Sequence, residues 1–209
     1  MNMRILLADD HPMFRQGLKA LLEREGFEIV GEASDGHEAV RLARKLEPNV
    51  AVLDVSMPLL NGIDAAREIH RRAMRTQVVL LTMFEEDAFA LEALRAGVRG
   101  YVLKAQAAAD LVGAIREVMR GAIYLSPGIS EAVVNALSKT DPPVDPLTDR
   151  ERQVLQLVAE GKTTKKIASI LGLSVKTAES HRTRIMHKLD IHETASLVRY
   201  AIRRGLIKP

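Results

Sequence analysis

The feature that most constrains this chain is an alternation of two hydrophobic periods in residues 1–120. Short, continuous apolar runs are typical of strands buried on both faces, and they cover residues 3–8, 27–33, 50–53, 78–81 and 101–103. Between and after these runs, apolar residues recur at helical spacing, over residues 13–22, 39–46, 61–72, 86–96 and 107–120. Five strands that alternate with five helices predict an α/β fold, a doubly wound five-stranded parallel sheet with helices on both faces.

A second, all-helical segment follows a proline-rich stretch. Pro142, Pro143 and Pro146 lie among polar residues, which indicates a linker, and residues 130–137 could add a short helix to it. Helical patterns then cover residues 149–160, 164–171, 174–189 and 193–204, and two of them, joined by a glycine-containing turn, predict a helix-turn-helix. We therefore predict an α/β domain of residues 1–121, a linker of residues 122–146 and a small all-α domain of residues 147–209.

Polar side chains stand at the ends of four predicted strands. Asp9 and Asp10 end the first, Asp54 the third, Thr82 the fourth and Lys104 the fifth. Because the carboxyl ends of parallel strands meet at one edge of the sheet, we expect these side chains to lie together. Three carboxylates repel one another unless a cation or a proton intervenes, and Mg²⁺ with oxygen ligands suits such a cluster.

These residue types fit phosphoryl transfer to a carboxylate. Asp54, at the end of the central strand, is the expected nucleophile and would carry an aspartyl phosphate. The two aspartates of the first strand, with Asp54 and the backbone carbonyl of Ser56, are the expected metal ligands. Lys104 would neutralise charge on the transferring group, and the Thr82 hydroxyl would donate to it. Each residue alone is more often a helix cap or a solvated side chain, so the prediction depends on their joint occurrence.

Residues 1–120 resemble the receiver domain of response regulators. The resemblance depends on five motifs in order, Ala8-Asp9-Asp10-His11, Asp54-Val55-Ser56-Met57-Pro58, Asn61-Gly62, Leu81-Thr82 and Gly100-Tyr101-Val102-Leu103-Lys104. It implies a flavodoxin-like sheet, phosphorylation of Asp54 by a sensor histidine kinase, Mg²⁺ as cofactor, and Thr82 and Tyr101 as switch residues. The chain departs from many receivers at Ala105, where they carry a proline after the lysine.

The C-terminal segment is basic. Residues 146–209 carry 13 Lys and Arg against 6 Asp and Glu, a net charge of +7, whereas residues 1–145 carry 17 against 21, a net charge of −4. Such an asymmetry suggests a polyanionic partner for the C-terminal part. The segment resembles the LuxR-type helix-turn-helix through Leu147-Thr148-Asp149-Arg150-Glu151, Ala159-Glu160-Gly161-Lys162, Lys166-Ile167-Ala168 and Leu173-Ser174-Val175-Lys176-Thr177. With the receiver, the whole chain is similar to the NarL/FixJ class.

This resemblance implies that the helix from Val175 lies in the major groove of double-stranded DNA. The expected base-facing residues are Glu179, Ser180 and Thr183, and the expected phosphate contacts are Lys176, Thr177, Arg182, Arg184 and Lys188. Glu179 departs from the frequent basic residue; its carboxylate could accept from cytosine or pair with Arg182 or Thr183. His181 is expected to be a hydrogen-bonding structural residue. The alternative to DNA contact is that these residues form an ordinary polar face of a small helical domain.

We therefore expect a transcription regulator and not an enzyme, in which phosphorylation controls dimerisation and promoter binding. A homodimer is expected, and RNA polymerase is a further candidate partner. The sequence has no cysteine, which excludes disulfides and thiol catalysis. Residues 1–10 have no signal-peptide layout and no apolar run reaches membrane-span length, so we expect a cytoplasmic protein without a membrane partner.

Four alternatives were weighed. A degenerate receiver would keep these residues without being phosphorylated, and a signalling adaptor would bind protein through its C-terminal helices. A phosphatase of the haloacid-dehalogenase type would carry a second acid two residues after Asp54, where this chain has Ser56. A LuxR regulator that senses a small molecule would need a ligand pocket in place of the acidic cluster.

Overall fold

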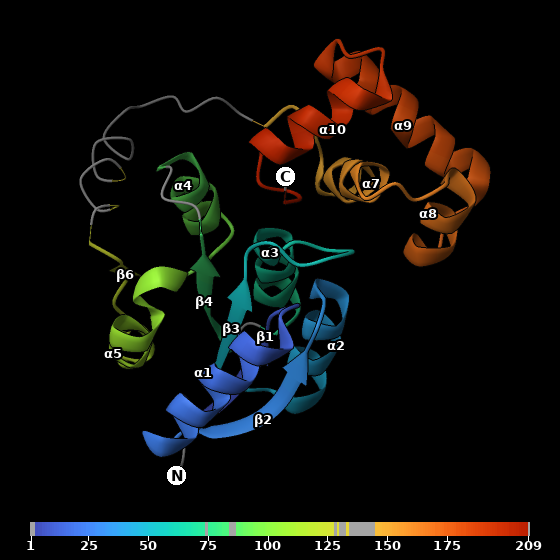
Figure 1. Cartoon of the computed structure of the whole chain (residues 1–209). Helices are drawn as coiled ribbons and strands as arrows, with labels where there is room; N and C mark the ends of the chain where they lie inside the picture. Colours follow the sequence, from blue (N-terminus) through green and yellow to red (C-terminus); the bar gives the residue numbers. More distant parts are fainter. Residues whose placement is uncertain are drawn as a thin grey trace. The chain divides into compact units, whose positions relative to one another are not determined.

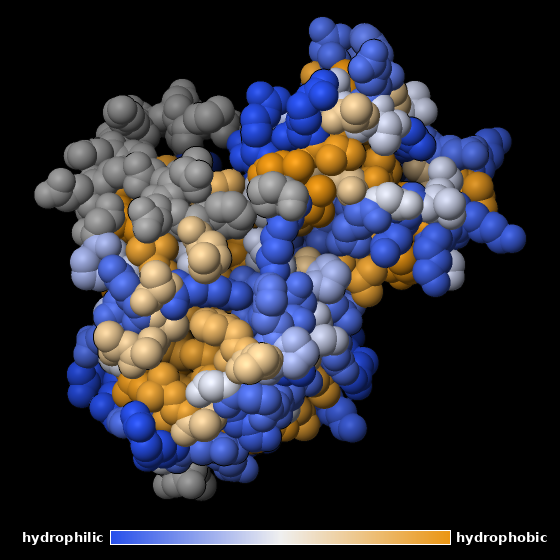
Figure 2. Space-filling model, viewed as in Figure 1, coloured by the Kyte–Doolittle hydropathy of each residue, from blue (hydrophilic) through white to orange (hydrophobic). Residues whose placement is uncertain are grey.

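The computed structural model describes residues 3–73, 75–83, 87–127, 129, 133 and 145–208. The chain divides into two compact units, Met1–Asp141 and Pro142–Pro209 (Figure 1). The predicted ends of the linker, between residues 121 and 122 and between residues 146 and 147, stay predictions. On the face drawn in Figure 2, hydrophilic residues make up most of the visible surface, with apolar patches between them.

The N-terminal unit contains a parallel sheet with the strand order β2-β1-β3-β4-β5-β6. All residues of the central strand β3 and of β5 are buried, as expected of parallel strands covered on both faces. This confirms the predicted doubly wound α/β fold. The strands are β1 (Arg4–Ala8), β2 (Glu28–Ala33), β3 (Val50–Asp54), β4 (Gln77–Thr82), β5 (Gly100–Leu103) and β6 (Tyr124–Leu125).

Helices cover both faces of this sheet because side chains alternate along each strand. Val50 and Val52 of β3 face a hydrophobic cluster with helices α1 and α5, whereas Ala51 and Leu53 face a second cluster with α2, α3 and α4. The helices are α1 (Pro12–Arg24), α2 (Gly36–Leu46), α3 (Gly62–Arg72), α4 (Asp87–Arg95) and α5 (Ala107–Met119). A short 3₁₀ turn, Lys104–Gln106, joins β5 to α5 at the position of the missing proline.

The prediction of five strands was one strand short, because β6 lies inside the segment expected to be linker. Gly121 has φ +88, which lets the chain reverse direction after α5. Tyr124 and Leu125 then pair in parallel with Gly100 and Tyr101 of β5. Two residues are too few to show an alternating pattern in a sequence. The short helix expected over residues 130–137 lies outside the described residues except for Val133, which is helical.

The C-terminal unit is helical, as predicted. Its helices are α7 (Asp149–Ala159), α8 (Thr164–Leu171), α9 (Val175–Leu189) and α10 (Thr194–Arg203). Helix α7 packs against each of the other three, and α8 packs against α9. Thr148, Thr163 and Ser174 accept hydrogen bonds from backbone amides in the first turns of α7, α8 and α9, so each of these helices begins at a side-chain cap.

The turn between α8 and α9 depends on a glycine. Gly172 has φ +64 and follows the last residue of α8, where the left-handed conformation ends a helix at low cost. Ser174 then caps α9 two residues later. This local chemistry produces the predicted helix-turn-helix. Within the described ranges, no helix combines the length and the hydropathy needed to cross a membrane.

Candidate functional site

Three carboxylates meet at the carboxyl edge of the parallel sheet. Asp9 and Asp10 directly follow β1, and Asp54 is the last residue of β3. The two strands are neighbours, and their register pairs the residues that precede Asp9 and Asp54. One oxygen from each carboxylate and the Nδ1 atom of His11 all lie within 4.8 Å of one another. Asp9 and Asp54 are buried, Asp10 is half-buried and His11 is exposed.

Lys104 joins this carboxylate cluster from the end of β5. Its Nζ atom lies 2.7 Å from Oδ2 of Asp9 and 2.9 Å from Oδ2 of Asp54. The same ammonium group lies 4.7 Å from the centre of the Phe14 ring, close enough for a cation–π contact. A flexible lysine side chain is thereby fixed between two carboxylates and an aromatic face.

The electrostatics of the cluster reflect this burial. Burial raises the pKa of the Asp54 carboxyl above its ordinary value, although the Lys104 ammonium group acts in the opposite direction. For Lys104, burial alone would lower the pKa, but attraction to Asp54 and Asp9 outweighs it and raises the pKa. Three carboxylates and one ammonium group leave two negative charges, which a divalent cation would balance.

The loop after β3 holds Asp54 through its backbone. The amide of Ser56 donates to Oδ1 of Asp54 over 3.3 Å, and the amide of Gly62 donates to the Val55 carbonyl over 2.8 Å. A Cβ atom on Gly62 would lie 2.1 Å from the carbonyl oxygen of Asp54, closer than atoms can approach. Asn61 accepts from the amide of Asp64 and caps α3. The Asn61-Gly62 pair therefore lets α3 begin directly against the Asp54 backbone.

Thr82 is the last residue of β4 and Tyr101 lies on the neighbouring strand β5, and both are fully buried. Tyr101 pairs with Leu80 and belongs to the hydrophobic cluster beside α4. Strand alternation places the Thr82 side chain on the same sheet face as those of Leu80 and Tyr101. The structure thus brings Asp9, Asp10, Asp54 and Lys104 together. It places Thr82 at the same edge of the sheet, and Tyr101 lies on the neighbouring strand, two residues before the partner of Thr82.

The sequence pattern did not predict the contacts of His11, Phe14 and Arg15 with this site, although His11 belongs to the first motif. Besides the Phe14 ring and the His11 imidazole, Arg15 donates to the backbone carbonyl of Asp9, and its Nε atom lies 3.1 Å from Oε2 of Glu32. The available signal was position, because the first turn of α1 begins two residues after Asp10 and must border the same edge. Position in the sequence predicts that these residues lie near the carboxylate cluster, but it does not predict which of its atoms they contact.

The eight residues proposed to contact DNA all lie on α9. Ala178 and Ile185 are buried and fix one face of this helix in the C-terminal unit. Ser180 and Arg182 are half-buried, and the remaining six are exposed, namely Lys176, Thr177, Glu179, Thr183, Arg184 and Lys188. The helix therefore presents a polar, mainly basic surface away from its own core.

Some of these side chains already have partners. Arg182 donates to Oγ1 of Thr194 over 2.7 Å, and the Thr183 hydroxyl donates to the backbone carbonyl of Glu179 over 3.2 Å. Across the described parts of the chain, the Glu179 carboxylate has no ion-pair partner, so neither of the pairings considered for it forms. Lys188 differs from the others, because its Nζ atom lies 2.7 Å from Oε2 of the buried Glu151.

Both units match known families. Residues 5–116 match the family described as "Response regulator receiver domain", and residues 145–201 match "Bacterial regulatory proteins, luxR family". The chain is a LuxR-family response regulator. This confirms the predicted class, with a receiver and a LuxR-type DNA-binding domain in one chain.

Relatives of this response regulator match over nearly its whole length. The transcriptional regulatory protein LiaR of Bacillus subtilis is 38% identical, over 98% of this chain and 99% of LiaR. The response regulator GacA of Pseudomonas aeruginosa is 36% identical, over 98% of this chain and 97% of GacA. A structure of the response regulator RcsB of Salmonella typhimurium has a TM-score of 0.67 at 30% identity, over 95% and 96% of the two chains. By name, LiaR is a transcriptional regulatory protein, and GacA and RcsB are response regulators.

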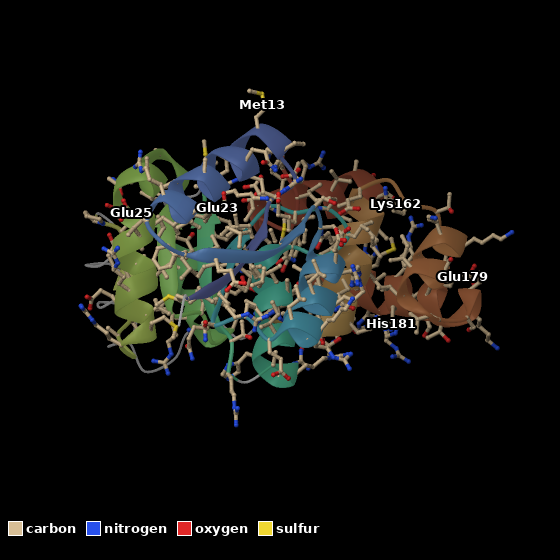
Figure 3. All side chains as sticks on the ribbon, turned by 90° about the horizontal axis from the view of Figure 1, so that it is seen from below. Met13, Glu23, Glu25, Lys162, Glu179 and His181 are labelled. Atoms are coloured by element: carbon tan, nitrogen blue, oxygen red, sulfur yellow. The ribbon has the colours of Figure 1, made fainter. Side chains whose placement is uncertain are left out.

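An RcsB–DNA complex is also similar to this response regulator, with a TM-score of 0.59 at 30% identity over 96% of this chain and 98% of that chain. Glu179 and His181 lie on the corresponding helix-turn-helix segment here, on α9 (Figure 3). The buried Nδ1 atom of His181 has no hydrogen-bond partner within the described residues, so the expected structural hydrogen bond does not form there. Burial, together with Arg184 nearby, lowers the pKa of the His181 imidazole.

Proposed function

We propose that this response regulator accepts a phosphoryl group on Asp54 from a sensor histidine kinase. The observation that supports this most directly is the buried Asp54 carboxylate, 2.9 Å from Lys104 and within one cluster with two further aspartates. A buried nucleophilic carboxylate beside a fixed cation is suited to an anionic phosphoryl donor.

The residues at this edge fit Mg²⁺. Their carboxylate oxygens converge within 4.8 Å, they keep two uncompensated negative charges, and oxygen is the ligand atom that this ion prefers. Asp9, Asp10 and Asp54, with the backbone carbonyl of Ser56, would hold the ion. When bound, Mg²⁺ would neutralise charge on the phosphoryl oxygens during transfer.

In the proposed transfer, an oxygen of Asp54 attacks phosphorus of a phosphohistidine. The phosphorus–oxygen bond forms as the phosphorus–nitrogen bond breaks, and the histidine ring nitrogen leaves with the bonding electron pair. Lys104 would contact a phosphoryl oxygen from its position between Asp9 and Asp54. The Thr82 hydroxyl would donate to another such oxygen, and Tyr101 would adjust to the movement of Thr82.

We further propose that α9 binds in the major groove of double-stranded DNA. Its exposed polar surface supports this, as does the likeness of the chain to RcsB, for which a DNA complex is known. Glu179, Ser180 and Thr183 would face bases, and Lys176, Thr177, Arg182, Arg184 and Lys188 would contact phosphates. Because Lys188 already forms an ion pair with Glu151, it would contribute less than Lys176 and Arg184.

Phosphorylation would act through dimerisation and promoter binding, with a homodimer as the active form. The proposed parts are a receiver of residues 1–121, a linker of residues 122–146 and a DNA-binding domain of residues 147–209. RNA polymerase is a further proposed partner. We place this activity in the cytoplasm, where chromosomal DNA is available.

Labelling with radioactive acetyl phosphate and Mg²⁺ tests the acceptor role of Asp54. We expect about one base-labile phosphoryl group per wild-type chain, none in Asp54→Asn, and a strongly reduced amount in Asp10→Asn. Asp190→Asn is a matched control, because Asp190 is exposed in the other unit and asparagine tolerates its positive φ. Equal labelling of wild type and Asp54→Asn would exclude Asp54 as the acceptor.

A further inference from the structure

The segment that follows α5 is fixed to the strand that carries Tyr101. Beyond the β6 pairing, the amide of Ser126 donates to the backbone carbonyl of Tyr101 over 2.9 Å. Ser126 is fully buried. The first residues after α5 therefore form a continuation of the receiver sheet, and not a free tether.

The Ser126 hydroxyl contacts the residue next to Lys104. Its Oγ atom accepts from the amide of Leu103 over 3.2 Å and donates to Oδ2 of Asp110 on α5 over 3.3 Å. Both capacities of a buried hydroxyl are thus used, and one is used at the last residue of β5. Lys104 directly follows Leu103 in the chain, so a displacement of the Lys104 backbone would also shift Leu103, whose amide donates to Ser126.

Two apolar residues beyond Ser126 belong to the same hydrophobic cluster as Tyr101. Ile129 and Val133 are each 1% exposed, and both belong to the hydrophobic cluster that contains Tyr101 and Phe89 of α4. Backbone hydrogen bonds continue the connection, from the Ile129 amide to the Ser126 carbonyl and from the Val133 amide to the Ile129 carbonyl. The Tyr101 ring therefore packs in one cluster with the segment that leads toward the C-terminal unit.

We propose that Ser126, Ile129 and Val133 form an output contact. Through it, the conformational change at the Asp54 site is transmitted out of the receiver. Ser126 is a positioning residue whose hydrogen bond responds to movement of Leu103 at the end of β5. Ile129 and Val133 respond to changes in the packing around Tyr101. The proposal rests on the proposed phosphorylation of Asp54. It assigns the readout to the segment after α5 in the N-terminal unit, and not to a contact with a second protomer.

The physical argument is that packed interiors do not deform gradually. Lys104 lies between Asp9 and Asp54, so a phosphoryl group on Asp54 must alter its position or its partners. A hydrogen bond weakens steeply as its distance and angle depart from the optimum, and close-packed side chains shift between discrete arrangements. Small movements of Leu103 and Tyr101 are therefore sufficient to loosen or tighten the output contact.

Amide exchange measured by NMR on the full chain tests this proposal. Beryllofluoride with Mg²⁺ serves as the phosphoryl mimic, and the amides of Leu103, Ser126, Ile129 and Val133 are followed. We expect the mimic to change the exchange rates of these amides severalfold in wild type and to leave them unchanged in Asp54→Ala. Altered signals of Thr82 report separately that the mimic has bound.

Ser126→Ala removes the hydroxyl at the centre of the contact. We expect the mimic still to alter the Thr82 signals, but its effect on the Ile129 and Val133 amides and on DNA affinity to fall at least fivefold. Thr76→Val is the matched control, because Thr76 is also buried and donates over 2.9 Å to the Pro48 carbonyl at the opposite edge of the sheet. This variant should retain the full effect.

The possible outcomes distinguish failure of the output contact from failure of the proposed function. If the Thr82 signals change in wild type while the amides of Ile129 and Val133 do not, the output contact is refuted and the proposed function stands. If Ser126→Ala keeps the full gain in DNA affinity, the role of Ser126 is refuted. If no signal near Asp54 responds, the proposed function and the output contact fail together. The wild-type measurement needs no variant, so a variant that fails to fold cannot hide the answer.

Discussion

At the scale of single residues, Lys104 decides how the carboxylate cluster can exist. It compensates buried Asp9 and Asp54 at once, and Phe14 holds it in place. The sequence predicted the lysine, because a charged residue directly after a buried strand is conspicuous. It could not predict Phe14 or Arg15 as neighbours, because their contacts depend on how α1 packs over the sheet edge.

Replacing Lys104 with methionine tests its part in phosphoryl transfer. The cation next to the developing charge is lost, so we expect the rate of labelling by acetyl phosphate to fall by about a hundredfold. Lys19→Met is the control, since Lys19 of α1 forms an ion pair with Glu32 of β2 and not with the carboxylates of the cluster. A rate for Lys104→Met within twofold of wild type would contradict this role.

Gly62 allows α3 to approach the Asp54 backbone closely, because it has no Cβ atom. An alanine there would place Cβ 2.1 Å from the Asp54 carbonyl oxygen, so the backbone must move. We expect Gly62→Ala to lower the free energy of unfolding of the N-terminal unit by about 1–3 kcal/mol and to slow labelling of Asp54. Gly17→Ala is the contrasting control: Gly17 lies within α1 with open space around its Cβ position, and alanine there should stabilise by about 0.5–1 kcal/mol. Equal stability of the two variants would refute the steric argument.

At the scale of elements, the helix-turn-helix depends on one buried acid. Glu151 forms a capping box with Thr148 at the start of α7 and an ion pair with Lys188 near the end of α9. Burial alone would raise the pKa of the Glu151 carboxyl, but the bonds from Lys188 and Thr148 outweigh it and lower the pKa below the ordinary 4.5. A capping box is readable in sequence as Thr148 followed by Glu151, whereas the bond to Lys188 requires the fold.

This shift contributes to the pH dependence of the C-terminal unit at acidic pH. A carboxyl with a lowered pKa in the folded state stabilises the fold above its unfolded pKa, and this contribution is lost as the pH falls through the folded pKa. We expect the free energy of unfolding of the unit to fall below about pH 4.5, and to fall less steeply in Glu151→Gln. Urea unfolding of the full chain, followed through methyl signals of Leu155 and Ile185, measures it. Identical pH profiles for wild type and Glu151→Gln would contradict this account.

The elements also show where prediction from sequence ends. Strands with four or more consecutive apolar residues, such as β1, β3 and β4, are visible because burial on both faces leaves no polar positions. β6 is invisible, because its two residues gain their place from pairing with β5 and from the Ser126 contacts. Helix ends were predicted where a serine cap or a glycine stop stands in the sequence, as at Ser174 and Gly172, whereas the left-handed conformation of Glu47 and Asp190 was not predicted.

At the scale of the whole molecule, charge is divided between the two units. The C-terminal segment carries a net +7 and the rest of the chain a net −4. DNA binding should therefore weaken strongly with salt, since each phosphate contact contributes about 0.9 to the slope of log affinity against log salt. We expect Lys176→Gln to reduce this slope by about 0.9 per protomer, while Lys45→Gln, an exposed lysine of the receiver, leaves it unchanged. Equal slopes for Lys176→Gln and wild type would remove Lys176 from the phosphate contacts.

We propose above that the Asp54 site controls DNA binding by α9. The most direct test is DNA binding, selected from a random-sequence pool, of full-length wild type and Asp54→Ala with Mg²⁺, in the presence and absence of beryllofluoride. We expect the mimic to tighten wild-type binding by about tenfold, within the usual range of allosteric coupling, and to leave the affinity of Asp54→Ala unchanged. Equal affinity under all four conditions would contradict control by Asp54, and absence of DNA binding at any salt concentration would contradict the role of α9.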